Sequence, residues 1–332
     1  MREPRRERLR AGHPGSARWH GTFSDRLRDF SFLACDGQVR TGEQLDCNGQ
    51  PAGYVESPEE VITHVDAHDN ETLFDSLTLK LPQSTSMADR VRMNTLSLAT
   101  AALAQTPSFW HAGADLLRSK SLDRHSDNSG DWFNVLDWSK QTNGFGRGLP
   151  PASDNQDKWP FQQPLLADPA LGPTTADVGQ ATAVAQDLLR LRFSTKLLRL
   201  GSAELIEQKV SFSGRGPDAL PGVVVMQVDD TVGRDVDTGL DGVLVVLDAS
   251  SEAVTVPVDG LAGESYRLSP VQAQGADPVV KAASWTSSSR TASVPGRTVT
   301  VFVDGQRPGK PGKPGKPGGH HAPSSGRVQI AR

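Results

Sequence analysis

Residues 61–70 read Val-Ile-Thr-His-Val-Asp-Ala-His-Asp-Asn, an alternating stretch that ends in three polar residues. Because successive side chains of a β-strand point to opposite faces, the alternation predicts a strand from Val61 to His68. One face would carry Ile62, His64, Asp66 and His68, and the other would carry Val61, Thr63, Val65 and Ala67. The triplet His68-Asp69-Asn70 then stands at the C-terminal end of this strand.

The segments that follow complete a β-α-β unit. A stretch rich in Leu, Ala and Met from about Ala88 to Gln105, with Pro107 just beyond it, predicts a helix. The short apolar run Ser108-Phe-Trp-His111, closed by Gly113, predicts a second strand. Strand, helix and strand in this order build a parallel sheet, so this region is expected to be α/β.

A long loop-rich segment comes next. Residues 113–175 are rich in Gly, Pro, Asn, Asp and Ser and contain Trp132, Trp138 and Trp159. Long segments of this kind are usually functional or disordered, and interleaved aromatic residues favour function. An apolar stripe at helical spacing then predicts a helix from about Val178 to Leu198.

The character of the chain changes after residue 200. Short β-prone runs separated by Gly, Pro, Asp and Ser predict a small antiparallel β-sandwich. These runs are Val223 to Met226, Val243 to Leu247, Val254 to Val258 and Thr298 to Val303. The expected division is an irregular stretch at 1–53, an α/β part at 54–200, an all-β sandwich at 201–305, and a disordered Gly/Lys/Pro tail at 306–332.

Charge and hydropathy disfavour several classes of partner. The chain has 35 basic and 39 acidic residues, so its overall field gives no reason to expect nucleic acid or an anionic membrane. No apolar run reaches the roughly 18 residues that a membrane helix needs. Met1 to Arg10 is basic, but the polar stretch from Ala11 to His20 behind it does not form a secretory signal. A neutral partner fits best.

The triplet His68-Asp69-Asn70 is the first candidate for chemistry. A ring nitrogen, a carboxylate and an amide side by side suit a polyhydroxylated substrate, and strand C-terminal ends carry the chemistry of parallel-sheet proteins. The spacing supports a second interpretation equally well, in which Asp69 or Asn70 caps a helix that follows.

A metal site on the same strand is not favoured. His64, Asp66 and His68 would share one face, but the zinc-protease helix motif needs Glu where Val65 stands. No further His or Cys is positioned by the sequence to complete a site. We therefore expect no metal ligands here.

A second candidate lies between Asp115 and Asp137. Its residues include Arg118, Asp131, Trp132 and Asn134. Flat aromatic rings beside carboxylates, amides and guanidinium groups are the usual lining of sugar sites, because the rings stack on sugar C–H faces. A surface loop pinned by its tryptophans explains the composition at least as well.

Taken together, these segments resemble the pullulanase-type starch-debranching enzymes, the α-1,6-glucosidase branch of glycoside hydrolase family 13. The resemblance covers roughly residues 18–30 and 50–305. The matching stretches are Gly21-Thr-Phe-Ser-Asp-Arg-Leu-Arg-Asp29, Val61 to Asp75, Arg90 to Met93, Phe109 to Trp138, Phe145 to Pro150 and Leu188 to Leu200.

The resemblance implies the C-terminal part of a (β/α)8 barrel followed by an antiparallel β-sandwich. It implies hydrolysis of α-1,6 branch links in pullulan, amylopectin or limit dextrins, with an α-glucan as partner and no cofactor, calcium being left open. Asp69 would be the transition-state-stabilising carboxylate and His68 would bind the same sugar. The expected substrate-binding residues are His68, Asn70, Arg118, Asp131, Trp132 and Asn134. Such enzymes are often exported in bacteria.

The same resemblance places the nucleophilic Asp and the general-acid Glu upstream of the stretch that begins at Gly21. Neither has a counterpart here, so we expect a fragment that is inactive by itself. Residues 31–49 match nothing in the family, which a deletion or frameshift would explain. The alternatives are a non-catalytic α-glucan-binding protein, or one half of a split enzyme completed by a chain with the missing barrel strands.

Overall fold

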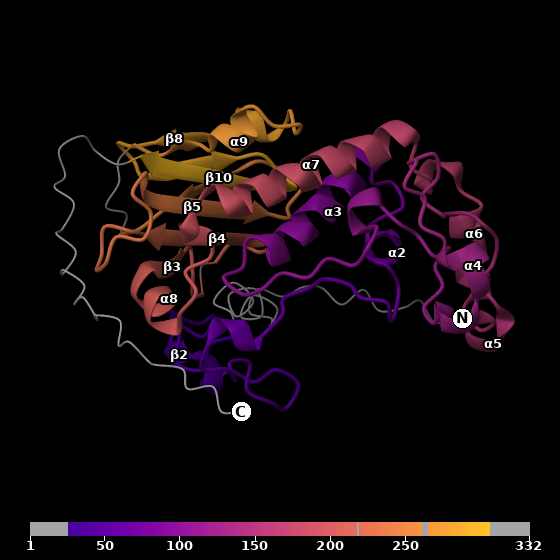
Figure 1. The fold of residues 1–332 in the computed structure, drawn as a ribbon, viewed down its shortest axis with the longest axis horizontal. Coiled ribbons are helices and arrows are strands. Elements are labelled where there is room, and N and C mark those ends of the chain that lie inside the picture. The colour runs from indigo at the N-terminus through magenta and orange to yellow at the C-terminus, as the bar shows by residue number, and fades with distance from the viewer. Residues whose placement is uncertain (1–25, 218, 261–264, 306–332) are drawn as a thin grey trace, which may run out of the picture.

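The structure is a computed structural model that describes residues 26–217, 219–260 and 265–305. Two antiparallel sheets lie at one end, and the long helices α3 and α7 run side by side from them toward a loop-rich end (Figure 1). The tail at 306–332 and most of the stretch from Gly21 to Asp29 lie outside the described residues.

The larger sheet has five strands in the order β3-β4-β5-β10-β7, and all neighbours are antiparallel. The smaller sheet has the order β6-β9-β8 and is also antiparallel. The strands are β3 (Val210–Ser213), β4 (Val223–Asp229), β5 (Leu240–Asp248), β6 (Val254–Pro257), β7 (Arg267–Leu268), β8 (Ser284–Thr286), β9 (Thr291–Val294) and β10 (Thr298–Gly305). The four β-prone runs predicted from the sequence are confirmed as β4, β5, β6 and β10.

The larger sheet is buried on both faces. Leu244 and Val246 of β5, with Phe302 of β10, share one core cluster with side chains of the smaller sheet. The alternate residues Val243 and Val245 belong to a second cluster that includes the helices α3 and α7. Burial on both faces explains why β5 has an uninterrupted apolar sequence instead of an alternating one.

Both predicted long helices are confirmed, with shifted ends. Helix α3 (Met87–Ala102) begins after Ser86, whose hydroxyl accepts the Asp89 amide at 3.2 Å, and α7 (Thr175–Ser194) begins with a Thr174 capping box. The sequence interpretation missed α2 (Leu73–Lys80), which is only eight residues long. The other helices are α4 (Gly130–Asn134), α5 (Ala152–Asn155), α6 (Trp159–Leu166), α8 (Ala203–Lys209) and α9 (Pro270–Ala273).

The predicted strand from Val61 to His68 is wrong in extent. The second predicted strand, Ser108 to His111, is wrong in the same way, because the two segments pair in parallel only through a single bridge, Thr63 to Ser108. The Thr63 amide donates to Pro107 O at 2.9 Å, and the Phe109 amide donates to Thr63 O at 3.0 Å. The segment then leaves the extended path because the Asp66 carboxylate accepts the Leu73 amide at the start of α2, at 3.0 Å.

The segment before residue 53 has more structure than its sequence indicates. Strands β1 (Ser31–Leu33) and β2 (Val39–Thr41) form an antiparallel pair. Phe30, which precedes β1, packs edge-on against Phe212 of β3 with ring centroids 6.0 Å apart. The pair therefore joins the main core. No helix in the described ranges is long and apolar enough to cross a membrane.

Replacement of Phe302 by alanine tests the core between the two sheets. Phe302 is fully buried, so Phe302→Ala should lower the free energy of unfolding by about 3–5 kcal/mol. The control Phe193→Ala removes a ring that is 64% exposed and should cost about 1 kcal/mol or less. Urea denaturation followed by circular dichroism measures both, and equal losses would contradict this assignment of the core.

Candidate functional site

The triplet His68-Asp69-Asn70 forms a turn between the Thr63 bridge and helix α2. The side chains of His68 and Asp69 are 88% and 78% exposed, and His68 Nε2 lies 3.7 Å from the nearer Asp69 carboxylate oxygen. Asn70 has a left-handed backbone with φ 61°, a conformation that Asn tolerates better than most residues. The turn therefore presents an imidazole and a carboxylate to solvent.

Neither Asp69 nor Asn70 caps α2, so the alternative interpretation of this triplet is wrong. The N-cap is Thr72, whose hydroxyl accepts the Asp75 amide at 3.2 Å. Asp66 accepts the next unpaired amide, that of Leu73. Because Thr72 and Asp66 accept these amides, the helix does not begin with a cap from the side chain of Asp69 or Asn70.

Lys120 stabilises the backbone of the turn by hydrogen bonds. Its ammonium group donates to His68 O at 3.2 Å and to Asn70 O at 2.8 Å, and the residue is 1% exposed. Arg124 adds a bond from Nε to Asn70 Oδ1 at 3.1 Å. These two contacts bring the predicted residues His68–Asn70 together with the loop that begins at Arg118.

A buried carboxylate, Asp75 of α2, anchors that loop. One oxygen accepts the Ser119 hydroxyl at 2.5 Å and the other accepts the Lys120 amide at 2.8 Å. Burial raises the pKa of Asp75 to about 6, and the hydrogen bonds to its carboxylate oppose that rise. Asp75 and Lys120 thus form one continuous connection from α2 to the turn.

The guanidinium group of Arg118 makes its contacts within the protein. Nη2 donates to Asn134 O at 2.7 Å, and Nη1 lies 3.3 Å from His111 Nε2. The other ring nitrogen of His111 is 3.5 Å from the buried Asp66 carboxylate. Burial lowers the pKa of Arg118, which the charges of Asp66 and Asp75 partly offset. Arg118 therefore joins the end of one predicted strand to the loop that carries Asn134.

Trp132 is an exposed platform at the start of the short helix α4. Its ring is 63% exposed, and its Nε1 donates to Arg147 O at 2.9 Å. The guanidinium carbon of Arg147 lies 5.3 Å from the ring centroid, and Nη1 donates to Trp132 O at 2.9 Å. Arg147 thus holds the ring by one hydrogen bond to the indole N–H and a cation–π contact, and holds the Trp132 backbone by a second hydrogen bond.

The remaining predicted residues flank this platform. Asp131 is exposed in the first turn of α4. Asn134 Nδ2 donates to Ser126 O at 2.6 Å and to Gly130 O at 3.0 Å, so its amide stabilises the turn around the helix. Arg118 donates directly to the Asn134 carbonyl, whereas Trp132 contacts Arg147.

Four residues of this region were missed: Asp66, Asp75, Lys120 and Arg147. A charged residue in a sequence is normally read as solvent-exposed. For Lys120, the available signal was the segment Leu116-Leu-Arg-Ser-Lys-Ser-Leu122, where two cations stand between leucines at both ends. Within the part of the chain that the structure describes, no three His, Cys, Asp or Glu side chains are grouped closely enough to hold a metal ion.

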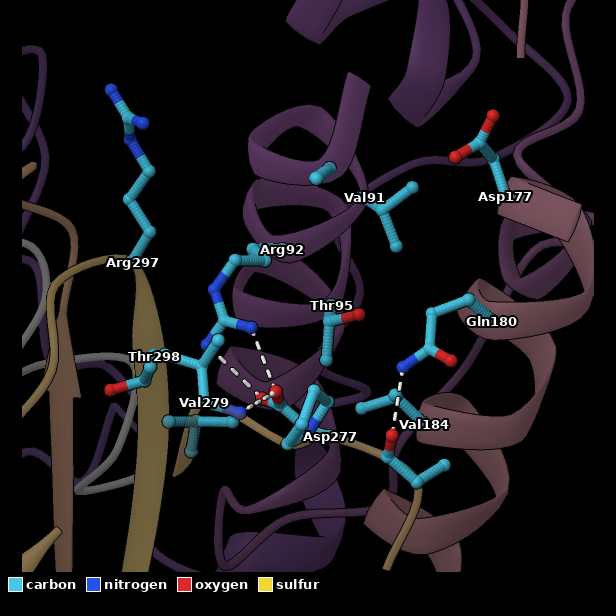
Figure 2. A pocket seen from close by; sticks show the side chains of 14 residues that line it. Val91, Arg92, Thr95, Asp177, Gln180, Val184, Asp277, Val279, Arg297 and Thr298 are labelled. Atoms are coloured by element: carbon cyan, nitrogen blue, oxygen red, sulfur yellow. Dashed lines mark hydrogen bonds and ion pairs between the residues drawn. The ribbon is translucent and has the colours of Figure 1, made fainter. Parts of the chain in front are cut away.

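A cavity of about 350 Å³ lies elsewhere, between α3, α7, the segment 276–279 and the start of β10. Arg92 of α3 and Asp277 point toward each other (Figure 2) and are joined by bonds of 2.7 and 3.1 Å. Gln180 of α7 donates to Ala276 O at 2.9 Å. None of the predicted site residues lines this cavity.

Comparisons with known proteins define the class first. The family described as "Alpha-1,6-glucosidases, pullulanase-type, C-terminal" matches residues 140–305, which places this part of the chain among the glycoside hydrolases. "Pullulanase 1, chloroplastic" of Arabidopsis thaliana is 40% identical over 285 residues, covering 84% of this chain and 29% of the relative. "Pullulanase" of Klebsiella pneumoniae is 36% identical over 278 residues, covering 83% and 25%.

Solved structures agree with these relatives. The ligand-free structure of PulA from Klebsiella pneumoniae matches 90% of this chain and 28% of its own, with a TM-score of 0.83 and 34% identity. The maltotriose complex of the same protein matches equally well. The chain belongs to the pullulanase family, as its motifs indicated, and it spans less than a third of the length of these relatives.

The buried Asp75 gives stability a defined pH dependence. Its pKa is about 6 in the folded chain against an ordinary 3.8, so the folded state keeps a proton that the unfolded state loses. The free energy of unfolding should therefore fall as pH rises from about 4 to about 6, by up to roughly 3 kcal/mol from this group.

Urea titrations at several pH values measure this dependence. Asp75→Asn removes the titrating group and should flatten the profile between pH 4 and 6. The control Asp157→Asn replaces an exposed carboxylate and should leave the profile unchanged. A profile of Asp75→Asn that parallels the wild type would contradict the assignment.

Proposed function

We propose that this chain supplies the α-glucan-binding end of a pullulanase-type α-1,6-glucosidase, the enzyme class that cleaves branch links in pullulan, amylopectin and limit dextrins. Family membership supports the class of reaction. The observation that carries the proposal is the turn at His68–Asn70, which presents two exposed polar side chains on a backbone that a buried lysine holds.

Asp69 is proposed to stabilise the transition state, not to form or break the glycosidic bond. Cleavage with retention passes through an oxocarbenium-like sugar, and a nearby carboxylate stabilises its positive charge. His68, 3.7 Å away, would donate a hydrogen bond to the same sugar. Such chemistry uses carboxylates alone and needs no metal or cofactor.

The proposed architecture assigns residues 54–200 to the C-terminal part of a (β/α)8 barrel and residues 201–305 to a β-sandwich. The parallel Thr63–Ser108 bridge, with α3 between its two partners, supports the barrel assignment. The core cluster shared by the two antiparallel sheets supports the sandwich. His68–Asn70 then follows a barrel strand, where enzymes of this fold place their catalytic groups.

Hydrolysis also needs a nucleophile and a general acid, and the family motifs matched here supply neither. We therefore propose that the chain alone binds glucan without cleaving it. The exposed ring of Trp132, fixed by Arg147, favours such a binding role, because a preorganised aromatic platform loses little freedom when a sugar stacks on it.

Affinity electrophoresis in amylopectin gels tests this proposal. The folded chain should be retarded, and Trp132→Ala should weaken binding by about 1 kcal/mol, or roughly fivefold in Kd. Phe193→Ala, which removes another exposed ring, is the control and should migrate like the wild type.

A parallel assay with pullulan should show no release of reducing ends. Unretarded migration of the folded chain would contradict the binding role. Turnover of pullulan that Asp69→Asn abolishes would contradict the proposed lack of activity.

A further inference from the structure

Lys120 donates hydrogen bonds to the carbonyl groups of the two residues on either side of Asp69. The ammonium donates to His68 O on one side and to Asn70 O on the other. The Asp69 side chain itself is 78% exposed, with a His68 ring nitrogen 3.7 Å from its carboxylate. The direction in which Asp69 points therefore depends mainly on its backbone, which the two bonds from Lys120 hold.

Lys120 is itself held firmly. Its amide donates to Asp75 at 2.8 Å, and the preceding Ser119 donates to the other oxygen of the same carboxylate. The next two residues, Ser121 and Leu122, have left-handed backbones with φ 56° and 63°. Such conformations are unfavourable for residues other than glycine and persist only where the surroundings enforce them.

Burial of a lysine is costly, because an ammonium group loses its hydration. Burial lowers the pKa of Lys120, and the negative charges of Asp123 and Asp75 partly restore it. An apolar side chain of similar length would fill the same space without that cost. It could not supply donation to the two carbonyls of the turn, nor a positive charge beside Asp123 and Asp75.

We propose that Lys120 is a positioning residue that orients Asp69 toward the bound sugar by fixing the carbonyls of His68 and Asn70. This inference rests on the proposed function of Asp69. Asp75 completes the arrangement by fixing the backbone from which Lys120 extends. Lys120 does not touch the sugar in this scheme.

Hydrogen exchange of the full chain, followed by mass spectrometry, tests the first step of this proposal. Lys120→Met should speed exchange of the amides in residues 68–71 at least tenfold while leaving β4 protected. The matched control is Lys209→Met, because Lys209 is an equally buried lysine, paired with Asp230 at 2.8 Å, in the β-rich part. It should lower stability without changing exchange in the turn.

Lys120→Gln provides a second variant in case Lys120→Met does not fold. Its shorter amide can reach at most one of the two carbonyls, so exchange in residues 68–71 should rise by a smaller factor. Wild-type exchange in this segment in either folded variant would overturn the proposal.

A double-mutant cycle with maltotriose tests the second step. Lys120→Met should weaken maltotriose binding about five- to tenfold when Asp69 is present and have almost no effect in an Asp69→Ala background. An equal loss in both backgrounds would overturn the positioning role, since a general structural defect does not depend on Asp69. If the wild type binds no maltotriose, the proposed function fails, and the exchange experiment alone decides the role of Lys120.

Discussion

Burial of the five-stranded sheet on both faces is the constraint on which the rest of the structure depends. Both faces of strand β5 are apolar and buried. The smaller sheet covers one face, and α3 and α7 cover the other. The segments that contain the candidate site precede α3 or connect α3 to α7. The Thr63–Ser108 bridge and the turn at His68–Asn70 are thus positioned by packing against a sheet more than a hundred residues later in the chain.

Buried charge organises the site, whereas apolar contacts organise the sheets. Asp75 and Lys120 are both almost fully buried, and each makes hydrogen bonds that a hydrophobic residue could not replace. Buried charged groups are poor sources of stability, because the loss of hydration offsets the gain from their hydrogen bonds. What they provide is a defined geometry for the backbone of the turn and of the loop beside it.

The sequence predicted the elements whose signal is local. The uninterrupted apolar run of β5 and the capped helices α3 and α7 are examples, and the triplet His68-Asp69-Asn70 was found from its composition and its family motif. The extent of the strand before it could not be predicted, because strand length depends on a pairing partner. Lys120 was missed for a similar reason: its role depends on contacts with His68 and Asn70, some fifty residues away in the sequence.

The segment at residues 276–279 also determines whether the two parts of the chain would separate after proteolytic cleavage between them. Arg92 of α3 binds Asp277, while Gln180 and Asp187 of α7 bind the backbone of Ala276. The β-rich part therefore contacts both long helices in addition to its covalent link near residue 200. A protease that cut that link would therefore nick the chain without releasing either piece. The two fragments would migrate together under native conditions and separate only in denaturant.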